Sequence, residues 1–144
     1  METQNYSNHR RVVAPFHFFV LPLFFLTFIG SGVNLYESWG DHERMYSASL
    51  ILVLALASML GTLFGRIFAL KAQDRAIRAE ENLRHFVLTG KLLAPAISMR
   101  QIIALRFAPD AEFVPLAGRA AAENMDPDAI KRAIKNWRAD LHRA

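Results

Sequence analysis

The chain has 144 residues and contains no cysteine. This absence excludes a disulfide framework, a thiolate nucleophile and a cysteine-based zinc site. The five histidines are scattered, and none falls in an HExxH spacing. The glycine patterns of phosphate loops, dinucleotide folds and serine hydrolases are also missing. We therefore predict no catalytic residue, no metal site and no cofactor, and we expect a protein that is not an enzyme.

Charged residues are missing from two long stretches, Val12–Tyr36 and Tyr46–Gly65. A membrane-spanning helix needs about 20 apolar residues, and a soluble core helix rarely stays apolar on every face for that length. We predict transmembrane helices at residues 12–36 and 46–70. A cleaved signal peptide is the alternative for the first run, but its apolar part would be about 7 to 15 residues long.

The charges that flank these runs differ in sign. The connecting loop, residues 37–45, is mostly acidic, whereas the other two flanks are basic, with Arg10, Arg11, Arg66, Lys71, Arg75 and Arg78. Short segments rich in Lys and Arg stay in the cytoplasm. The pattern predicts a multi-pass membrane protein, with a cytoplasmic tail at residues 1–11, both termini inside and the loop outside.

The second apolar run continues into charged sequence without a proline or glycine break. We predict one helix from Tyr46 to Leu88, whose residues 71–90 form a cytoplasmic stalk that stops at Gly90. A solvated spacer is the simplest role for this stalk, and a rod that carries a partner site is the alternative. The expected ion pairs, four residues apart, are Asp74–Arg78, Glu80–Arg84 and Glu81–His85.

Small side chains recur every four residues in the second run. Such a stripe lets two helix backbones approach closely in lipid. We favour packing between the two spans of one hairpin, with a homodimer interface as the alternative. The predicted helix-packing interface consists of Ala57, Gly61, Gly65 and Ala69.

The remaining segment, residues 91–144, reads as a small cytoplasmic module of about three amphipathic helices. Ser98 and Gln101 have the spacing of a capping box, and Pro109 lies near the start of the next helix. Asp126 is the expected cap of the last helix, which we predict to continue to Leu141. We also expect Arg106 to pair with Asp110 or Glu112.

The last predicted helix has a basic side and an apolar side. The basic side carries Lys131, Lys135, Arg138 and His142, and the apolar stripe includes Trp137. Packing of the stripe onto the other helices is the simplest interpretation. Contact with an anionic lipid surface ranks second, and nucleic acid ranks third because no groove-reading fold is evident. The candidate partner or lipid contacts are Lys131, Lys135, Trp137 and Arg138.

Four sequence blocks resemble a family of small bacterial membrane proteins that is a domain of unknown function. The blocks are QNYSNH (4–9), RIFALKAQDRAIRAEENLR (66–84), RQIIALRFAPDAE (100–112) and IKRAIKNWRADL (130–141). The resemblance implies a bacterial membrane protein, so we expect the predicted hairpin in the bacterial inner (cytoplasmic) membrane. It implies no particular activity, substrate or site residue.

The function that we predict is a non-enzymatic, membrane-anchored module that binds a protein partner or a second copy of itself. An accessory or homo-oligomeric component of a transport assembly is the alternative. His17 and Asn34 are polar residues of the first run, but residues 50–56 offer no polar side chain for a pathway. No small-molecule substrate is evident.

Overall fold

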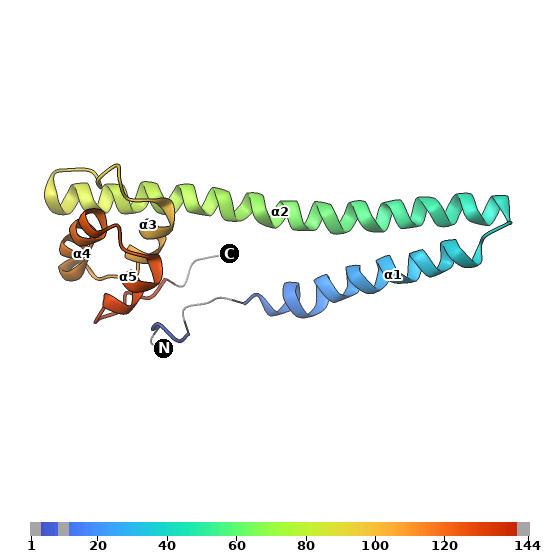
Figure 1. Cartoon of the computed structure of the whole chain (residues 1–144), viewed down its shortest axis with the longest axis horizontal. Coiled ribbons are helices and arrows are strands. Elements are labelled where there is room, and N and C mark those ends of the chain that lie inside the picture. Colours follow the sequence, from blue (N-terminus) through green and yellow to red (C-terminus); the bar gives the residue numbers. More distant parts are fainter. Residues whose placement is uncertain (1–3, 9–11, 141–144) are drawn as a thin grey trace. The chain divides into compact units, whose positions relative to one another are not determined.

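The computed structural model describes residues 4–8 and 12–140, and all regular secondary structure in them is helical, as predicted. The elements are η1 (Phe16–Val20), α1 (Leu21–Glu37), α2 (His42–Thr89), α3 (Met99–Leu105), α4 (Asp110–Glu123) and α5 (Pro127–Ala133) (Figure 1). The chain divides into two compact units. The hairpin unit is Val12–Ala69, and the helical unit is Leu70–Ala144 together with the N-terminal segment. The helix α2 contributes residues to both.

A π-helix opens the first long helix of the hairpin unit. The Leu21 amide in η1 donates to the carbonyl of Phe16, one residue further back than in an α-helix. The next residue, Pro22, has no N–H, and in a regular α-helix its ring would meet the carbonyl of Phe18. The wider π turn gives this ring room, so η1 and α1 continue as one apolar helix.

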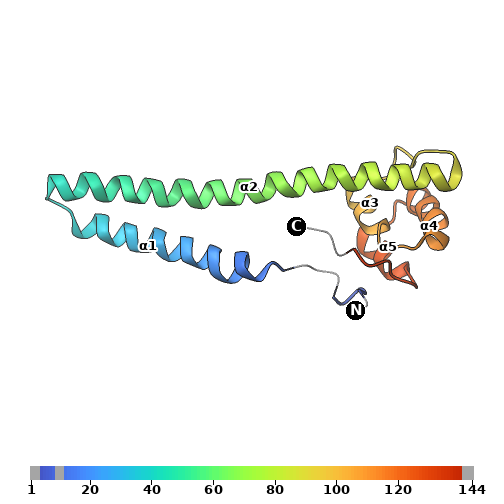
Figure 2. The same ribbon diagram turned by 180° about the vertical axis from the view of Figure 1, so that it is seen from behind.

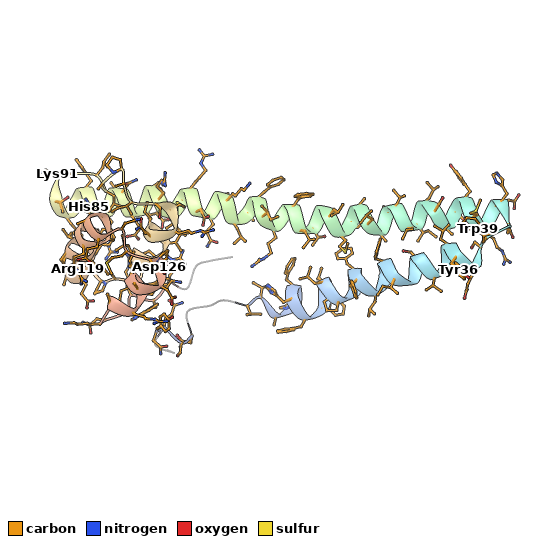
Figure 3. The ribbon with its side chains drawn as sticks, in the orientation of Figure 1. Tyr36, Trp39, His85, Lys91, Arg119 and Asp126 are labelled. Carbon is orange, nitrogen blue, oxygen red and sulfur yellow. The ribbon has the colours of Figure 1, made fainter. Side chains whose placement is uncertain are left out.

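A tight turn joins α1 to α2. Gly40 has φ of +93°, a conformation that side chains rarely adopt. Asp41 then caps α2, because its Oδ1 accepts the Arg44 amide at 3.2 Å. Tyr36 and Trp39 are exposed at this turn (Figure 3). The helix α2 therefore begins four residues before the predicted start at Tyr46.

The two helices of the hairpin unit bury few side chains against each other. The helices Phe16–Glu37 and His42–Thr89 are both long and apolar enough to cross a membrane. The buried residues of the hairpin unit are small, namely Ser31 and Ser38 before the turn and Ala48 and Ala55 after it. Ala48 and Ala55 are seven residues apart and so share one face of α2.

The helical unit has a true hydrophobic core. Its largest fully buried side chains are Phe107, Phe113, Leu105 and Ile130, and α3, α4 and α5 gather beside the end of α2 (Figure 2). Ile77 of α2 belongs to the same core. Residues 71–89 are therefore one wall of a packed unit, which differs from the solvated stalk that the charge pattern predicts.

Local signals set most helix ends of the helical unit. Gly90 ends α2 with φ of +74°. The Ser98–Gln101 capping box is confirmed, because the Gln101 amide donates to Ser98 Oγ at 3.4 Å and the Ser98 amide donates to Gln101 Oε1 at 2.7 Å. Asp126 caps α5, as predicted, by accepting the Asp128 amide at 2.8 Å.

The predicted helix from Asp126 to Leu141 is wrong beyond Ala133, where α5 ends. Ile134 is already extended, with ψ of 122°. The Glu112 carboxylate accepts the amides of Lys135 and Asn136, at 2.8 Å and 3.0 Å. Both amides would otherwise continue the helix. A carboxylate of α4, distant in the sequence, therefore takes the hydrogen bonds that α5 would need.

Candidate functional site

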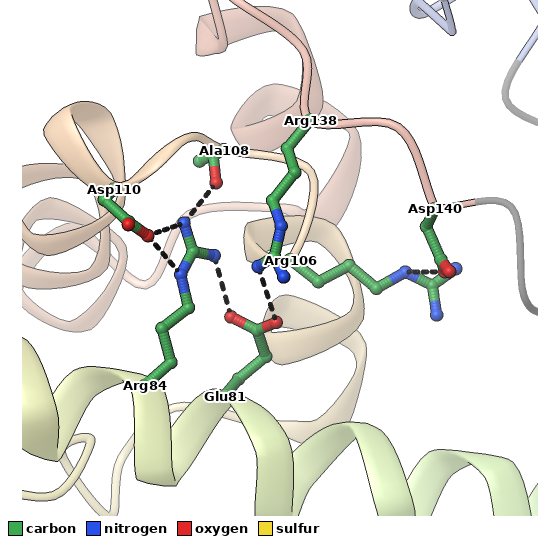
Figure 4. Close-up of polar contacts among 7 residues, drawn as sticks. All are labelled: Glu81, Arg84, Arg106, Ala108, Asp110, Arg138 and Asp140. Carbon is green, nitrogen blue, oxygen red and sulfur yellow. Dashed lines mark hydrogen bonds and ion pairs between the residues drawn. The ribbon is translucent and has the colours of Figure 1, made fainter.

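Six charged side chains of the helical unit form a cluster, and they come from α2, the end of α3, the start of α4 and the C-terminal segment. Figure 4 shows these side chains: Glu81, Arg84, Arg106, Asp110, Arg138 and Asp140. We call this set the charge cluster. Its members alternate in sign, so each charge lies next to at least one opposite charge.

Glu81 is the buried carboxylate of the charge cluster. Only 5% of its surface is exposed. Its Oε2 accepts from Arg84 Nη1 at 3.0 Å, and its Oε1 lies 3.7 Å from Arg138 Nη1. A buried carboxylate without partners loses several kcal/mol of hydration, and contacts with these two arginines offset that loss.

Arg84 joins α2 to the loop between α3 and α4. Its Nε donates to Asp110 Oδ1 at 2.7 Å, and its Nη2 donates to the carbonyl of Ala108 at 2.8 Å. The guanidinium carbon also lies 4.3 Å from the centre of the Phe113 ring. The planar fork of arginine suits several simultaneous acceptors. This side chain therefore fixes where α4 begins relative to α2.

Arg106 holds the C-terminal segment. Its Nε lies 3.2 Å from Asp140 Oδ2, and its guanidinium carbon lies 4.7 Å from the centre of the Phe107 ring. Sequence spacing predicts pairs with Asp110 or Glu112, and that prediction is wrong. Asp110 binds Arg84 instead, and Glu112 binds backbone amides.

The predicted pairs along α2 also differ from those observed. Arg84 pairs with Glu81, three residues away, and not with Glu80. The imidazole Nδ1 of His85 contacts the carbonyl of Lys91 at 2.7 Å rather than Glu81 (Figure 3). The reason is that the predicted pairs assume a solvated helix, whereas this face of α2 is covered.

Two clefts lie beside the charge cluster, and Glu80, Glu81 and Arg138 border both of them. One has a volume of about 340 Å³ and also contacts Arg106 and Asp140. The other has a volume of about 490 Å³ and also contacts Arg84 and Asp110. Because the ionic groups on their walls, apart from Glu80, are paired with one another, the arrangement is typical of a structural network.

A third hollow, of about 340 Å³, is apolar. It is lined by Glu80, Leu83, Arg84, Val87, Leu88 and Asp110. Leu83, Phe86, Val87 and Leu92 are all strongly exposed around the end of α2. A unit that is otherwise well packed rarely leaves so many large apolar side chains exposed without a binding role. Sequence analysis missed this surface because residues 71–90 read as a charged spacer.

The predicted contact residues near the C-terminus do not share one helix face. Lys131 lies on α5, whereas Lys135, Trp137 and Arg138 follow its end. The Trp137 ring is half-buried, with its centre 5.0 Å from the centre of the Phe107 ring. The basic face of a single helix is therefore absent, and His142 lies outside the described residues.

The predicted small-residue interface of α2 does not pack within its own hairpin. Ala57, Gly61, Gly65 and Ala69 are all exposed. A Cβ atom added at Gly61 or Gly65 would meet no other atom within 4 Å. The stripe therefore stays a predicted interface, with its residues exposed in this structure, whereas Ala48 and Ala55 are buried on a different face of α2.

The N-terminal segment docks onto the helical unit, which sequence analysis did not predict. The Tyr6 hydroxyl donates to Asp128 Oδ2 at 2.6 Å and accepts from Arg132 Nη2 at 3.1 Å. Gln4 Oε1 accepts the Asp140 amide at 2.7 Å. The Tyr6 hydrogen bond, followed by the charge of Arg132, lowers the pKa of the Asp128 carboxyl below its usual value.

Across the described ranges, 4–8 and 12–140, no three His, Asp or Glu side chains are grouped in a way that could hold a metal ion. The polar groups of the helical unit instead bind one another or the backbone. These observations describe an all-helical protein with two exposed apolar helices and a packed, charged C-terminal unit.

The chain belongs to a family of unknown function (DUF6526), whose model matches residues 1–144. The resemblance to a domain of unknown function is thereby confirmed. Comparison with curated proteins and with solved structures found no match. The function of this chain therefore has to be inferred from its own residues.

Proposed function

We propose that the protein is an integral protein of the bacterial inner membrane whose helical unit acts by binding another protein chain rather than by catalysis. The hairpin unit is its anchor. The basic flanks of the hairpin would lie in the cytoplasm and the acidic turn outside. Arg66, at the cytoplasmic end of the second span, has its guanidinium carbon 5.1 Å from the Phe16 ring centre.

One observation carries the membrane assignment: the apolar helices are exposed. Their most hydrophobic windows have mean hydropathies of 1.9 and 2.1, yet only 6% and 11% of these windows are buried. The core helix of a soluble protein would be mostly buried by its own chain. Exposed apolar surface of this extent in water is strongly unfavourable, whereas lipid tails would solvate it.

The binding assignment is supported by the composition of the surface of the helical unit. The buried charges Glu81 and Arg84 are paired within the charge cluster, whereas Leu83, Phe86, Val87 and Leu92 are exposed. Apolar side chains that a folded unit leaves in water mark protein contacts more often than reaction sites. The partner on this proposal is a protein, and the bilayer is the solvent of the anchor.

The absence of cysteine from the chain gives a clean test of the anchor. Single variants Glu43→Cys and Glu123→Cys place a thiol at the start of α2, next to the turn, and on α4. In intact cells, a membrane-impermeant maleimide should label the first variant, and should label the second only after permeabilisation. The protein should also resist extraction by alkaline carbonate. Release by carbonate, or labelling of both thiols in intact cells, would contradict the proposal.

Binding is tested with a photo-crosslinking side chain at Val87, in cells. The matched control is the same side chain at Glu123, which is exposed on α4 away from the apolar surface. A discrete adduct from Val87 and none from Glu123 is the expected result. Trp137 is a poor position for the probe, because its ring packs on Phe107. No adduct at Val87 would count against a binding role.

A homo-oligomeric component of a transport assembly is the second candidate, favoured by the exposed small-residue stripe of α2. Gly61→Leu should disrupt an oligomer formed in the bilayer without disturbing the hairpin, since a side chain there meets nothing in its own chain. Gly30→Leu on α1, which also meets nothing within 4 Å, is the control. If both variants keep the oligomeric state of the unmodified protein, this candidate loses its support.

A further inference from the structure

The helix α2 has a second apolar face within the helical unit, on the side away from the core. Ile77 and Glu81 point into the unit, where both are buried. Around the helix from them lie Ala72, Ala76, Ala79, Leu83 and Phe86, all of them exposed, and Ala76 and Leu83 also border clefts of the unit. We call these five residues the α2 seam. The exposed fractions of Leu83 and Phe86 are 63% and 50%.

The spacing of the α2 seam alternates between four and three residues. This is the spacing of positions a and d in a heptad, with Ala76 and Leu83 at a and the other three at d. Alanine at such positions allows two helices to approach closely, and Leu83 and Phe86 supply the larger knobs. A single surface helix that only packs on its own unit needs no second stripe of this kind.

Opposite charges flank the seam in the register that a parallel pair of helices requires. With Ala76 at a, Arg75 takes position g and Glu80 takes position e, five residues later. In a parallel two-stranded coiled coil, residues at g and at the following e of the other helix form ion pairs. Within one helix, residues five apart lie on different sides, and neither side chain takes part in an ion pair within the described residues.

We propose that the α2 seam binds the α2 seam of a second copy of this chain, in parallel, with Arg75 of each copy opposite Glu80 of the other. The flanking charges select this occupant, because the seam is complementary to itself only in the parallel register. In an antiparallel pair, position g faces g and position e faces e, so Arg75 of one copy could not lie opposite Glu80 of the other and the charge complementarity would be lost.

This inference deepens the proposed function and rests on it in one respect. Two copies anchored in one membrane share an orientation, which favours parallel pairing. Anchoring also raises the effective concentration of one seam near another. This matters because the seam covers only about two heptads, a length that gives little stability to free helices in water.

Cysteine crosslinking in membranes tests the geometry directly, because the natural chain has no cysteine. Single variants Ala79→Cys and Leu83→Cys place thiols in the seam, and Lys71→Cys and Arg78→Cys place them on the flank of the same helix. A disulfide requires Cα atoms within about 7 Å. Under mild oxidation of membranes that contain the full chain, the seam variants should give about tenfold more disulfide-linked dimer than the flank variants, since only seam positions approach that distance.

A charge swap tests the register. In the Leu83→Cys background, Arg75→Glu and Glu80→Arg each place like charges opposite one another and should lower the yield of dimer several-fold. The double variant Arg75→Glu/Glu80→Arg restores opposite charges and should recover the yield. Residues at these two positions do not face each other within one helix, so recovery reports on pairing between copies.

Several outcomes would overturn the proposal. Equal crosslinking at seam and flank positions would indicate random collision, and no dimer from either seam variant would indicate that the seams do not meet. A heterogeneous adduct from Leu83→Cys, with the mass of another protein, would assign the seam to a different partner. Carbonate extraction of the same samples distinguishes these outcomes from failure of the membrane anchor, since a protein without an anchor would be extracted. In that case, crosslinking of the purified chain in detergent would test the α2 seam independently of the membrane.

Discussion

At the scale of single residues, the helical unit depends on charges that are buried together. Arg84 contacts two carboxylates and a carbonyl, and only 11% of its side chain is exposed. A hydrophobic replacement of a whole buried ion pair is often tolerated, but removal of one partner leaves the other charge without compensation. Each charge of the cluster therefore depends on its neighbours, and the contributions of the ion pairs to stability are not independent.

We expect Arg84→Leu to destabilise the helical unit by about 3 to 5 kcal/mol, because Glu81 would keep its buried charge and lose its nearer partner. Thermal unfolding of the purified full-length protein in detergent, followed by near-ultraviolet circular dichroism, measures the change. The control is Arg119→Leu, whose side chain is 57% exposed and pairs with Glu123. An equal effect of both substitutions would contradict a special role for Arg84.

The Glu112 carboxylate should make the stability of the helical unit depend on pH. The amide of Lys135, and then those of Asn136, lower the pKa of this carboxyl below its usual value. A group whose pKa is lower in the folded state stabilises the fold above its unfolded pKa, and this contribution is lost as the pH falls through the folded pKa. Stability from Glu112 should thus be present at neutral pH and disappear in acid.

Comparison of Glu112→Gln with the unmodified protein isolates this contribution. We expect the unmodified protein to have the higher unfolding temperature at neutral pH. The difference should shrink as the pH falls below the unfolded-state pKa of about 4.3 and on through the lower pKa of the folded state. Glu123→Gln is the control, since it does not bind backbone amides in the described structure. A difference that stays constant down to strongly acid conditions would refute the assigned cause.

At the scale of elements, a helix end can be predicted from the sequence when the residues that set it lie nearby in the chain. A helix end that is set by a residue distant in the sequence cannot. Gly90, the Ser98–Gln101 box and the Asp126 cap all act within a few residues of the end that they set. The end of α5 depends on Glu112, more than 20 residues earlier. No reading of the segment after Ala133 alone contains this information, which is why the predicted helix is too long.

The same distinction explains how much of the candidate site the sequence could predict. The periodicity of α2 predicts a helix, but the partners of Arg84 depend on how α3 and α4 fold back. The five exposed residues of the α2 seam can be recognised as a second apolar face only after the buried positions of α2, Ile77 and Glu81, are known. Periodicity alone does not tell which of two apolar faces is covered.

The N-terminal segment is an element whose docking can be tested. Tyr6→Phe removes the hydroxyl that binds Asp128 and Arg132, and should raise the pKa of Asp128 toward its usual value. We expect faster hydrogen exchange of the amides of residues 5–8, by about an order of magnitude for the loss of one charge-assisted hydrogen bond. Tyr46→Phe on α2 is the matched control, and unchanged exchange in Tyr6→Phe would show that the hydroxyl does not hold the segment.

At the scale of the whole molecule, the two units bury their apolar residues in different ways. The hairpin unit exposes large apolar side chains on most sides, among them Phe18, Phe25, Leu54 and Phe68. The helical unit encloses Phe107 and Phe113 in a core. Burial of apolar surface away from water is favourable in both cases. Packing achieves it in the helical unit, and lipid would have to cover the apolar surface of the hairpin unit.

This difference predicts that the helical unit does not need the membrane for its own fold. A fragment that begins at Leu70 should be soluble in buffer without detergent and should unfold cooperatively, because its core lies between α2, α3, α4 and α5. The fluorescence of Trp137, packed on Phe107, reports the transition. Phe107→Ala in the same fragment should cost about 3 to 5 kcal/mol and broaden or abolish it. If the unsubstituted fragment binds a hydrophobic dye and shows no cooperative transition, the packing of this core depends on the hairpin, and the separation of the molecule into a lipid-solvated anchor and a self-sufficient unit fails.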